Sequence, residues 1–464
     1  MQGSLGAAVA LAVALALPIA APASGPLETA IWDSDNAPAR VAGAGATTTY
    51  IQLRWSEVAP ATRPPGFVAD DPEDAAYRWE GLDGAIKRAR EHGLAPLLSV
   101  YGAPAWAEQK GDGPAGTVRP DPTQLARFAK AAAERYSGRF ERLPRVRYWQ
   151  LWAEQNLFFH LNPQRIGNRA FAPIWYRKML NAFAPAIKSV HRDNLVITGG
   201  LAPFTSTTGA KRLWGLGPLH FMRVMLCMSK QLKPTCKTKS QFDVWAHHPY
   251  TSGGPTHSAY FPDDVSLGDL PEMRRLLVAA YRAGHIKSPR LPRFWVTEFS
   301  WDTSPPDPKG VPLQLHARWV SEALYRMWSA GVSLVTWLQL RDTPMSVSYE
   351  QSGLYFNDWR PKPALQAFRF PFVAFKERSG RILVWGRTPS SKPGRVVIEQ
   401  TIGRRWRRLA TIRADRYGIF QRRLRGYPTG YVRARLVATG EKARAFSLRV
   451  PPDRFVNPFG TRPD

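Results

Sequence analysis

Eight short apolar runs alternate with amphipathic stretches, and this alternation constrains the fold more than any other feature of the sequence. The apolar runs cover 27–32, 48–55, 95–101, 146–152, 195–200, 242–248, 293–299 and 332–340. The stretches between them show helical spacing: Leu82, Ile86 and Ala89 share one stripe, and Gly93 then supplies a helix stop signal. Eight successive strand-helix units predict a (β/α)8 barrel, also called a TIM barrel.

An open, doubly wound sheet is the main competitor for this α/β pattern. Such sheets carry a glycine-rich phosphate turn after their first strand. The corresponding stretch here, "WDSDNAPARVAG" at 32–43, is not such a turn. The sequence therefore favours the closed barrel, which we expect to span residues 25–372.

The pattern of the sequence changes near residue 377, where helical spacing gives way to strand-like runs. From there to 455, strand-like runs such as "RILVWGR" and "RVVIEQTI" are separated by Gly, Pro and Ser turns. This pattern predicts a small all-β sandwich domain after the barrel. We expect the last residues, 456–464, to form a flexible tail.

The first 24 residues are typical of a signal peptide. They contain a long uncharged apolar run, and Ala21-Pro22-Ala23 offers a cleavage site of the A-x-A type. No Lys or Arg precedes Arg40, so an uncleaved N-terminal anchor remains the alternative. We expect a secreted or cell-envelope protein that acts as a monomer.

Only two cysteines occur, Cys227 and Cys236. In an oxidising compartment they can close a small loop, although two free thiols remain possible. Nothing in the sequence resembles a structural zinc site, which needs four ligands at tighter spacing. We expect a disulfide and no metal.

The net charge of +28 is concentrated at the C-terminal end. Residues 376–464 hold 22 Lys and Arg against 6 Asp and Glu, a net +16. Such a field favours an anionic cell-wall polymer or acidic polysaccharide as a partner. A simply Arg-rich solvated surface is the alternative, and the absence of a nucleic-acid-binding motif argues against nucleic acid.

Two glutamates fall at the ends of predicted strands, where a barrel places its chemistry. Glu154 follows the run 146–152, sharing its parity with Tyr148, Gln150 and Trp152, and Glu298 shares a parity with Phe294 and Val296 in the run 293–299. Paired carboxyl groups are what a glycosidase needs, because one protonates the leaving oxygen and the other attacks the anomeric carbon. The alternative for each glutamate alone is a solvated strand end without a role.

With these motifs in view, the barrel resembles glycoside hydrolases of clan A, near families 5 and 39, over about residues 27–370. The resemblance rests on "LWAEQN", "WVTEFSW", "RWSEVAP", "GAPAWA" and "HHPY". It implies that Glu154 is the acid/base and Glu298 the nucleophile. It also implies that His248 and Tyr250 support them, that Trp337 forms a sugar platform, and that no cofactor is needed.

Two departures from the clan pattern bear on activity. Ala153 and Gln155 stand where the clan has Asn and Pro around the acid/base, and its Arg before Trp55 is replaced by Tyr50. The remaining candidate substrate contacts are Arg54, Tyr101, Trp152, Asn156 and Trp301, which lie near predicted strand ends.

We therefore expect an exported retaining β-glycosidase that cleaves an oligo- or polysaccharide by double displacement. The loss of the clan Asn at position 153 motivates an alternative, a catalytically impaired carbohydrate-binding barrel of the cell envelope. A third reading is an envelope adhesion protein whose basic β-domain is the working part.

Overall fold

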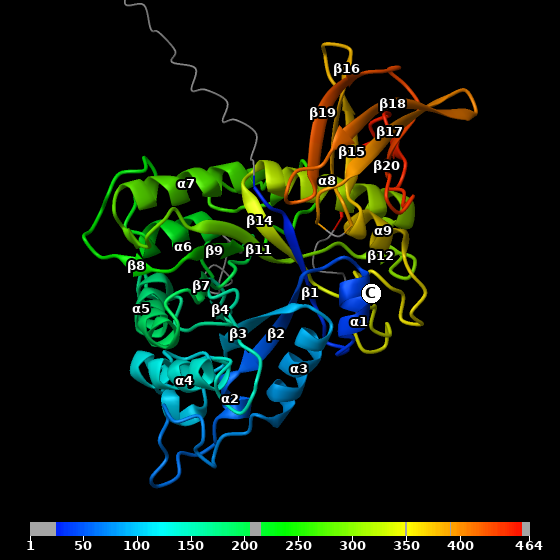
Figure 1. The fold of residues 1–464 in the computed structure, drawn as a ribbon. Helices are drawn as coiled ribbons and strands as arrows, with labels where there is room; N and C mark the ends of the chain where they lie inside the picture. The colour runs from blue at the N-terminus through cyan, green and yellow to red at the C-terminus, as the bar shows by residue number, and fades with distance from the viewer. Residues whose placement is uncertain (1–24, 205–214, 349, 390, 457–464) are drawn as a thin grey trace, which may run out of the picture.

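A closed barrel of eight parallel strands forms the larger part of the molecule (Figure 1). The structure is a computed structural model that describes residues 25–204, 215–348, 350–389 and 391–456. The barrel strands are β1 (Glu28–Trp32), β2 (Thr48–Arg54), β3 (Ala95–Tyr101), β4 (Tyr148–Leu151), β7 (Leu195–Thr198), β9 (Val244–His247), β11 (Arg293–Phe299) and β14 (Val332–Trp337). Their spatial order follows the chain, and β14 closes onto β1, so the predicted barrel is confirmed. The proposed signal peptide, 1–24, lies outside the described residues.

Helices surround the barrel and cover the outer face of its strands. The longer ones are α3 (Glu80–Glu91), α4 (Pro122–Arg135), α5 (Ala172–Val190), α7 (Leu270–Arg282) and α8 (Leu313–Ser329), and the shorter ones are α1 (Pro38–Gly43), α2 (Trp55–Val58), α6 (Pro218–Met225) and α9 (Pro363–Arg369). Helix α3 buries Ile86 and Ala89 and ends just before Gly93, whose φ of 74° suits a helix stop. Helix α4 begins at a capping aspartate, Asp121, whose carboxylate accepts the backbone N–H groups of Thr123 and Gln124.

The loops carry short pieces of regular structure. These are the 3-10 helices η1 (Ala105–Ala107) and η3 (Leu267–Asp269), and the strand pairs β5 (Arg165–Ile166) with β6 (Arg169–Ala170), β8 (Ser240–Gln241) with β10 (Ile286–Lys287), and β12 (Thr303–Ser304) with β13 (Val311–Pro312). The barrel interior is filled by its own small cluster, which includes Tyr50, Leu97 and Trp295. The barrel is thus a packed core, and a ligand can enter only at its ends.

The C-terminal domain consists of two antiparallel sheets, which agrees with the predicted β-domain. One sheet contains β15 (Phe372–Lys376), β16 (Arg381–Arg387) and β19 (Ile419–Arg425); the other contains β18 (Arg405–Arg413), β17 (Arg395–Ile402), β20 (Tyr431–Leu436) and β21 (Phe446–Ser447). The first strand begins at Phe372, five residues before the expected boundary at 377.

The β-domain is fixed to the barrel by a buried arginine and by aromatic packing. The Arg387 guanidinium donates to the carbonyl of Leu27 at 2.9 Å and to the hydroxyl of Thr29 at 3.1 Å, both at the start of the barrel. Trp385 packs against Tyr325 and Trp328 of α8. Because a buried guanidinium is stable only with its partners in place, the two domains hold one another.

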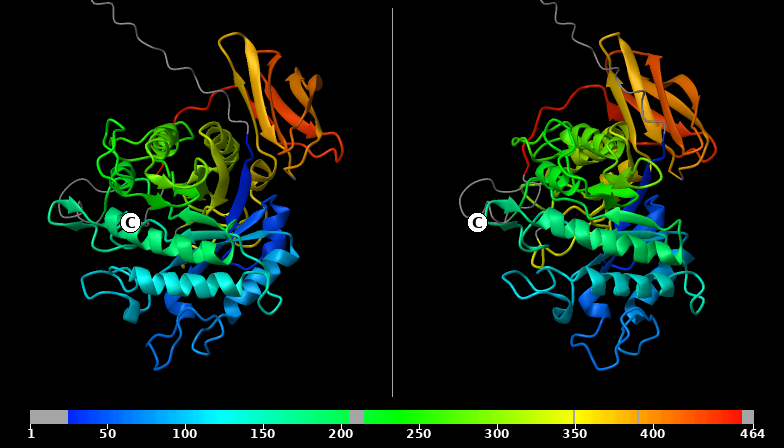
Figure 2. Two further views of the ribbon diagram at one scale, coloured as in Figure 1. Left: turned by 60° about the vertical axis from the view of Figure 1, so that its left-hand side comes forward. Right: turned by 90° about the vertical axis from the view of Figure 1, so that its left-hand side faces the viewer.

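The last described residues return from the β-domain to the barrel, as the red segment in Figure 2 shows. Arg454 donates to the carbonyl of Gly310 at 3.1 Å, and the backbone N–H of Val456 donates to Ser252 at 3.0 Å. Val456 is buried, so the predicted tail is held at its first residue, and residues 457–464 lie outside the described part. None of the described helices combines the length and apolar character needed to cross a bilayer.

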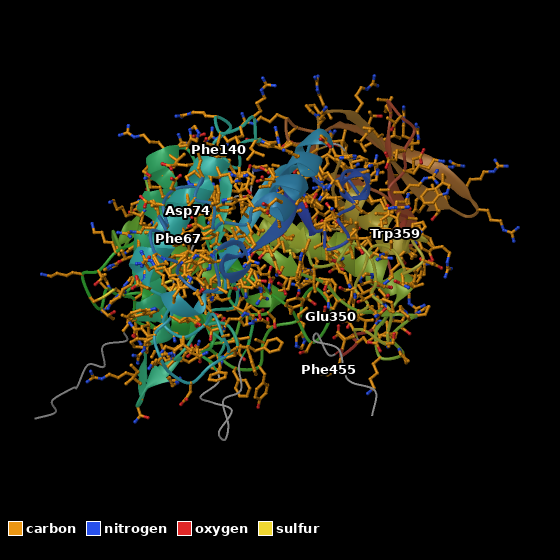
Figure 3. All side chains as sticks on the ribbon, turned by 90° about the horizontal axis from the view of Figure 1, so that it is seen from below. Phe67, Asp74, Phe140, Glu350, Trp359 and Phe455 are labelled. Atoms are coloured by element: carbon orange, nitrogen blue, oxygen red, sulfur yellow. A yellow bond between two sulfur atoms is a disulfide. The ribbon has the colours of Figure 1, made fainter. Side chains whose placement is uncertain are left out.

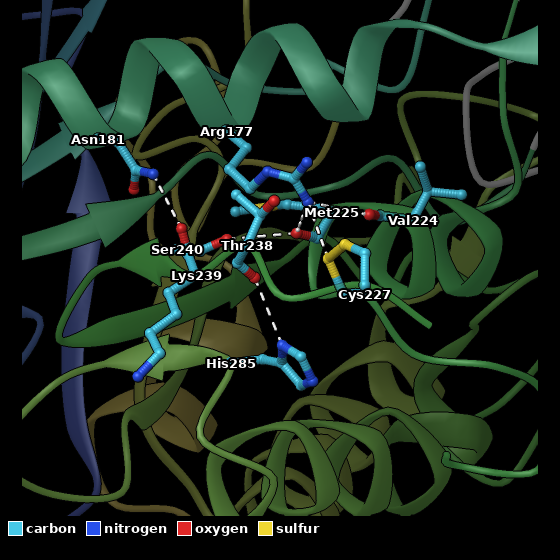
Figure 4. Close-up of a disulfide and its surroundings, with 10 residues drawn as sticks. Arg177, Asn181, Val224, Met225, Cys227, Thr238, Lys239, Ser240 and His285 are labelled. Atoms are coloured by element: carbon cyan, nitrogen blue, oxygen red, sulfur yellow. Dashed lines mark hydrogen bonds between the residues drawn. A yellow bond between two sulfur atoms is a disulfide. The ribbon is translucent and has the colours of Figure 1, made fainter. Parts of the chain in front are cut away.

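Cys227 and Cys236 form the expected disulfide after α6 (Figure 4). The side chain of Arg177 on α5 reaches this loop and donates to the carbonyl of Met225 at 2.9 Å and to Sγ of Cys227 at 3.3 Å. The disulfide loop is therefore fastened to the outer helical layer of the barrel.

Candidate active site

Glu154 reaches the barrel mouth through an unusual backbone turn at the end of β4. Trp152 and Glu154 have φ values of 67° and 49°, in the left-handed region that residues with a side chain seldom adopt. The turn is held because the Glu154 N–H donates to the carbonyl of Gly200, after β7, at 2.7 Å. Non-glycine residues held in this region cluster at functional sites.

Glu298 reaches the same mouth because β11 loses its regular register near its end. The pairing of β11 with β14 shifts between Val296 and Phe299. In a regular strand, successive side chains point to opposite faces. Here Thr297 and Glu298 both face His248, since the shift turns the glutamate toward the site.

The parity predicted for Phe294, Val296 and Glu298 holds for the first two residues and fails at Glu298. Phe294 and Val296 pack in the large core under the helices, while Trp295 between them fills the barrel interior. Parity alone would therefore have pointed Glu298 away from the mouth. The register shift is the feature that the sequence did not reveal.

Glu154, His248 and Glu298 converge at the barrel mouth from β4, β9 and β11. One side-chain ligand atom from each lies within 4.8 Å of those of the other two. Nδ1 of His248 is 3.1 Å from Oε1 of Glu154 and 3.9 Å from Oε2 of Glu298. The imidazole is fully buried, and the two carboxylates are 17% and 24% exposed. The two carboxyl groups can therefore act on one bond of a bound molecule.

Tyr250 and Thr297 complete the hydrogen bonds of this group. The Tyr250 hydroxyl donates to Oε1 of Glu298 at 2.7 Å, and burial raises the Tyr250 pKa, so the phenol remains a donor. Nε2 of His248 lies 3.2 Å from the Thr297 hydroxyl. Gly200 provides the room, because a Cβ there would overlap the His248 ring.

The pKa values of the two carboxyl groups are driven apart. Burial raises the pKa of Glu298 to about 6, with the charges of Glu154 and of Glu350 (labelled in Figure 3) acting in the same direction, against the opposing effects of His248 and Tyr250. Burial also acts to raise the pKa of Glu154, but the hydrogen bond and charge of His248 outweigh it, so the pKa is lowered. The sequence alone, with Trp152 beside Glu154 and a second carboxyl group expected nearby, predicts a raised Glu154 pKa. That prediction is wrong because the His248 imidazole lies next to the carboxylate.

The same three side chains are the only group in the described chain close enough to chelate a metal ion through His, Cys, Asp or Glu. The hydrogen bonds of His248 to Glu154 and of Tyr250 to Glu298 explain their closeness without a cation. The arrangement suits proton transfer and nucleophilic attack.

Comparison with known proteins finds similarity in three-dimensional structure but not in sequence. No protein-family model matches the sequence, and neither does any curated protein. A family 39 glycoside hydrolase from the gut symbiont Bacteroides cellulosilyticus WH2 matches with a TM-score of 0.51 and 16% identity, over 86% of this chain and 79% of that one. This chain has a fold similar to that of a family 39 glycoside hydrolase. A glucosidase from Croceicoccus marinus follows at a TM-score of 0.46 and 14% identity, over 84% and 88% of the chains.

At this level of identity the likeness concerns the barrel fold, so the reaction has to be inferred from the site. In this glycosidase-like barrel, Glu154 and Glu298 occupy the ends of the fourth and seventh strands. These are the strands on which the sequence resemblance placed the acid/base and the nucleophile.

His160 is a neighbour of Glu154 that sequence reasoning did not single out. Its Nε2 lies 3.6 Å from Oε2 of Glu154, the oxygen that His248 does not contact, and its side chain is 38% exposed. Burial lowers the His160 pKa. His160 follows β4 by nine residues in an irregular loop, and no periodic signal indicates which loop side chain turns back to the mouth.

Three tryptophans expected at the cleft are buried instead. Trp152, Trp301 and Trp337 are at most 2% exposed. Their indole N–H groups donate to the backbone carbonyls of His160, Gly253 and Ser352, respectively. Bulky rings at strand ends pack beneath the loops of the mouth, so these tryptophans shape the site from below rather than offering an open stacking face.

The remaining candidates divide between surface and interior. Tyr101 is partly exposed, and its hydroxyl donates to the side-chain oxygen of Gln52 at 3.0 Å. The Arg54 guanidinium lies 4.9 Å from the centre of the Tyr101 ring. Arg54 also forms an ion pair with Glu57 at 3.1 Å. Asn156 is fully buried, and its amide bridges the backbone of Ala202 and Leu216, so it supports the loop and cannot contact substrate directly.

The clan departures have structural counterparts. Gln155, in the place of the clan proline, is buried and donates to the carbonyl of Gly199 at 2.9 Å. Tyr50, in the place of the clan arginine, accepts a hydrogen bond from Gln150 inside the barrel at 3.3 Å. Ala153 brings no polar group to the mouth.

Proposed function

We propose that this protein is a retaining β-glycosidase whose nucleophile is Glu298 and whose acid/base is Glu154. The observation that carries the proposal is the separation of the two carboxyl groups, which have oxygens within 4.8 Å of each other. Retaining enzymes hold their carboxyl groups about 5–5.5 Å apart, whereas inverting enzymes leave about 6.5–9.5 Å for a water molecule. The close pair therefore supports double displacement.

Tyr250 supports the assignment of Glu298 as the nucleophile. A nucleophilic carboxylate must be ionised, and its free oxygen must face the anomeric carbon. Because the Tyr250 phenol donates to Oε1, it favours the ionised form and leaves Oε2 to attack. A glycosyl ester then forms at Glu298 as the bond to the leaving oxygen breaks.

His248 supports proton delivery by Glu154. Burial opposes the charged form of His248, but the charges of Glu298 and Glu154 outweigh it and raise the imidazole pKa. The proton that Glu154 needs is thus held next to it, across 3.1 Å. Attack by Glu298 neutralises one charge that holds this proton on His248, which lets it move to Glu154 and on to the leaving oxygen.

The second step uses the same groups in reverse. Glu154, now ionised, accepts a proton from a water molecule as the water attacks the glycosyl ester, and Glu298 is released. The proton then passes from Glu154 back to His248, which restores the free enzyme, and the product retains its configuration at the anomeric carbon. The resident side chains supply every proton transfer in this sequence.

The test is an activity screen on aryl β-glycosides and polysaccharides, with proton NMR to identify the anomer released first. We expect the β-anomer first. Glu298→Ala should abolish turnover, and Glu154→Ala should retain activity only on substrates with good leaving groups. Release of the α-anomer, or wild-type rates in either variant, would refute the assignment.

A second candidate is a carbohydrate-binding barrel without efficient catalysis, and Ala153 favours it. The clan asparagine at this position bonds the sugar 2-hydroxyl, an interaction that strengthens in the transition state. Sugar binding without hydrolysis across the whole panel would support this candidate. In that case, Ala153→Asn should raise the activity above background.

We further propose that the protein is exported and that its β-domain meets an anionic polymer of the envelope. The apolar segment 1–24 supports export, and the charge of the β-domain supports the partner. Nitrogen-tipped side chains project from this domain in Figure 3. If adhesion is its main role, residues 377–464 account for retention on the polymer, and high salt should release the full-length protein.

A further inference from the structure

A groove of about 460 Å³ lies where the β-domain meets helix α8. None of Glu154, His248 and Glu298 lines it. One wall comes from α8, and the other comes from β20, β21 and the residues on either side of β21. The lining residues include Leu315, Arg318, Tyr431, Arg444, Phe446 and Arg449. The volume is within the range of about 300–1,000 Å³ found for small-ligand sites.

The charge of the groove has one sign. Three arginines line it, Arg318, Arg444 and Arg449, and none of its lining residues is an Asp or a Glu. Arg449 is exposed, and no side-chain partner of its guanidinium is found among the described residues. Its guanidinium therefore remains available for an anion, for which the planar fork of arginine is well suited.

The other two arginines are held in place mainly by neutral groups, although Nε of Arg318 also lies 4.0 Å from Oε2 of Glu322 on the same helix. Arg318 donates to the carbonyl of Ser447 at 2.8 Å and stacks on Phe446, with 3.9 Å between Cζ and the ring centre, but its buried Nε has no hydrogen-bond partner. Arg444 donates to the side-chain amide oxygen of Gln314. Burial lowers the pKa of both guanidinium groups, so an anion in the groove would stabilise their charges.

Most of the remaining lining is apolar or aromatic, and Gln314, Ser321 and Ser447 are its neutral polar members. Tyr431 is 51% exposed, and Leu315 and Ala445 lie nearby on the groove surface. An aromatic ring and aliphatic carbons suit the carbon-rich face of a sugar ring better than a bare phosphate. The groove thus combines a site for an anion with a surface for a pyranose.

We propose that this groove binds an acidic polysaccharide chain, with a uronate carboxylate paired to Arg444 and Arg449 and its sugar ring on Tyr431. The proposal gives the anionic partner a defined site and narrows it to a carboxylated glycan. It does not depend on catalysis, because the groove and the barrel mouth share no residue.

Isothermal titration of the full-length protein with the trimer of galacturonic acid tests the proposal. We expect binding in the millimolar range or tighter, and no binding of galactotriose, which has the same sugar rings without carboxylates. Arg444→Gln with Arg449→Gln should weaken binding of the acidic trimer at least tenfold. The matched control is Arg405→Gln with Arg407→Gln, an equal change of charge on exposed residues of β18 outside the groove, which should change the affinity less than twofold.

The melting temperature of each variant is measured alongside, and Arg449→Gln alone, whose side chain holds nothing in place, should still weaken binding. Equal losses in the two pairs would show that overall charge binds the trimer and would overturn the site. Failure of the acidic trimer to bind, equal binding of galactotriose, or equally tight competition by polyphosphate would also overturn it. A protein that binds the trimer but hydrolyses no glycoside keeps this site and loses the proposed reaction.

Discussion

The Tyr250 hydroxyl donates a hydrogen bond to Oε1 of Glu298 across 2.7 Å, from the end of the strand that neighbours the glutamate's own. The bond fixes one carboxylate oxygen and leaves the other, Oε2, on the side of His248. A buried carboxylate between another carboxylate and a phenol is a site arranged for chemistry, because burying charge without a task is costly.

The pKa of Glu298 predicts the acid limb of the pH profile. Burial raises this pKa to about 6, and the nucleophile must be ionised to attack. Activity is therefore present above pH 6 and is lost as the pH falls and Glu298 becomes protonated. We expect kcat/KM to fall about tenfold per pH unit below 6. A profile that stays flat down to pH 4.5 would contradict the assignment.

Tyr250→Phe should move this limb toward higher pH. The hydroxyl stabilises the ionised form of Glu298, so its removal raises the glutamate pKa further. We expect a loss of kcat/KM of about tenfold or more at pH 6 and a clearly smaller loss at pH 8, from profiles of both proteins. A loss of equal size at every pH would instead indicate structural damage.

His160→Ala should slow the hydrolysis of substrates whose leaving group needs protonation by a general acid. His160 faces the one oxygen of Glu154 that is available to the leaving group. For phenyl glycosides we expect a fall in kcat/KM of about tenfold, within the contribution of general acid catalysis, and no change for dinitrophenyl glycosides. His92→Ala, an exposed change at the end of α3, serves as the control. Equal slowing of both substrates would exclude a role in proton transfer.

Gly200→Ala tests whether the position of His248 matters. An added Cβ would overlap the imidazole and crowd the Thr297 hydroxyl, so the ring must move. A shift of about 1 Å in a catalytic site costs on the order of a hundredfold in rate, and we expect that loss in kcat. Gly81→Ala is the matched control, since nothing lies within 4 Å of its new Cβ and α3 gains up to ~1 kcal/mol. Unchanged kcat in Gly200→Ala would show that His248 need not be fixed.

The disulfide should stabilise the fold without taking part in the reaction. Cys227 and Cys236 are nine residues apart, and closing a loop of this size contributes ~2.5–3 kcal/mol by chain entropy. We expect Cys227→Ser with Cys236→Ser to lower the free energy of unfolding by about this amount in a denaturant titration. Turnover at low temperature should be unchanged, and wild-type protein in reductant should behave like the variant. Equal stability of the oxidised and reduced forms would rule this contribution out.

The strands could be predicted because local pattern determines them. Residues 95–101 and 293–299 were expected as strands with the limits that the structure shows. The boundary of the β-domain was placed too late because β15 follows α9 closely, without the turn-rich linker that marks a boundary in sequence. Hydrophobic periodicity predicts helices and strands well, but it predicts the boundaries between domains poorly.

The candidate site could be predicted only in part, for physical reasons. Strand ends indicate which residues approach the mouth, and Glu154 and Glu298 do meet there. Burial at the mouth depends on loops from several units, which is why Trp301 is covered rather than open. The pKa of Glu154 depends on an imidazole 94 residues away in the chain, and no local pattern encodes that distance.

The contacts of Arg387 with the first barrel strand determine which truncated forms of this protein can fold. Its guanidinium binds to the start of the first barrel strand, so a shortened chain that stops at the last barrel helix leaves the Leu27 carbonyl and the Thr29 hydroxyl without this donor. The catalytic half cannot be excised as a ready-made module and grafted onto another carrier. Engineered versions of this protein therefore have to keep the barrel and the β-domain together.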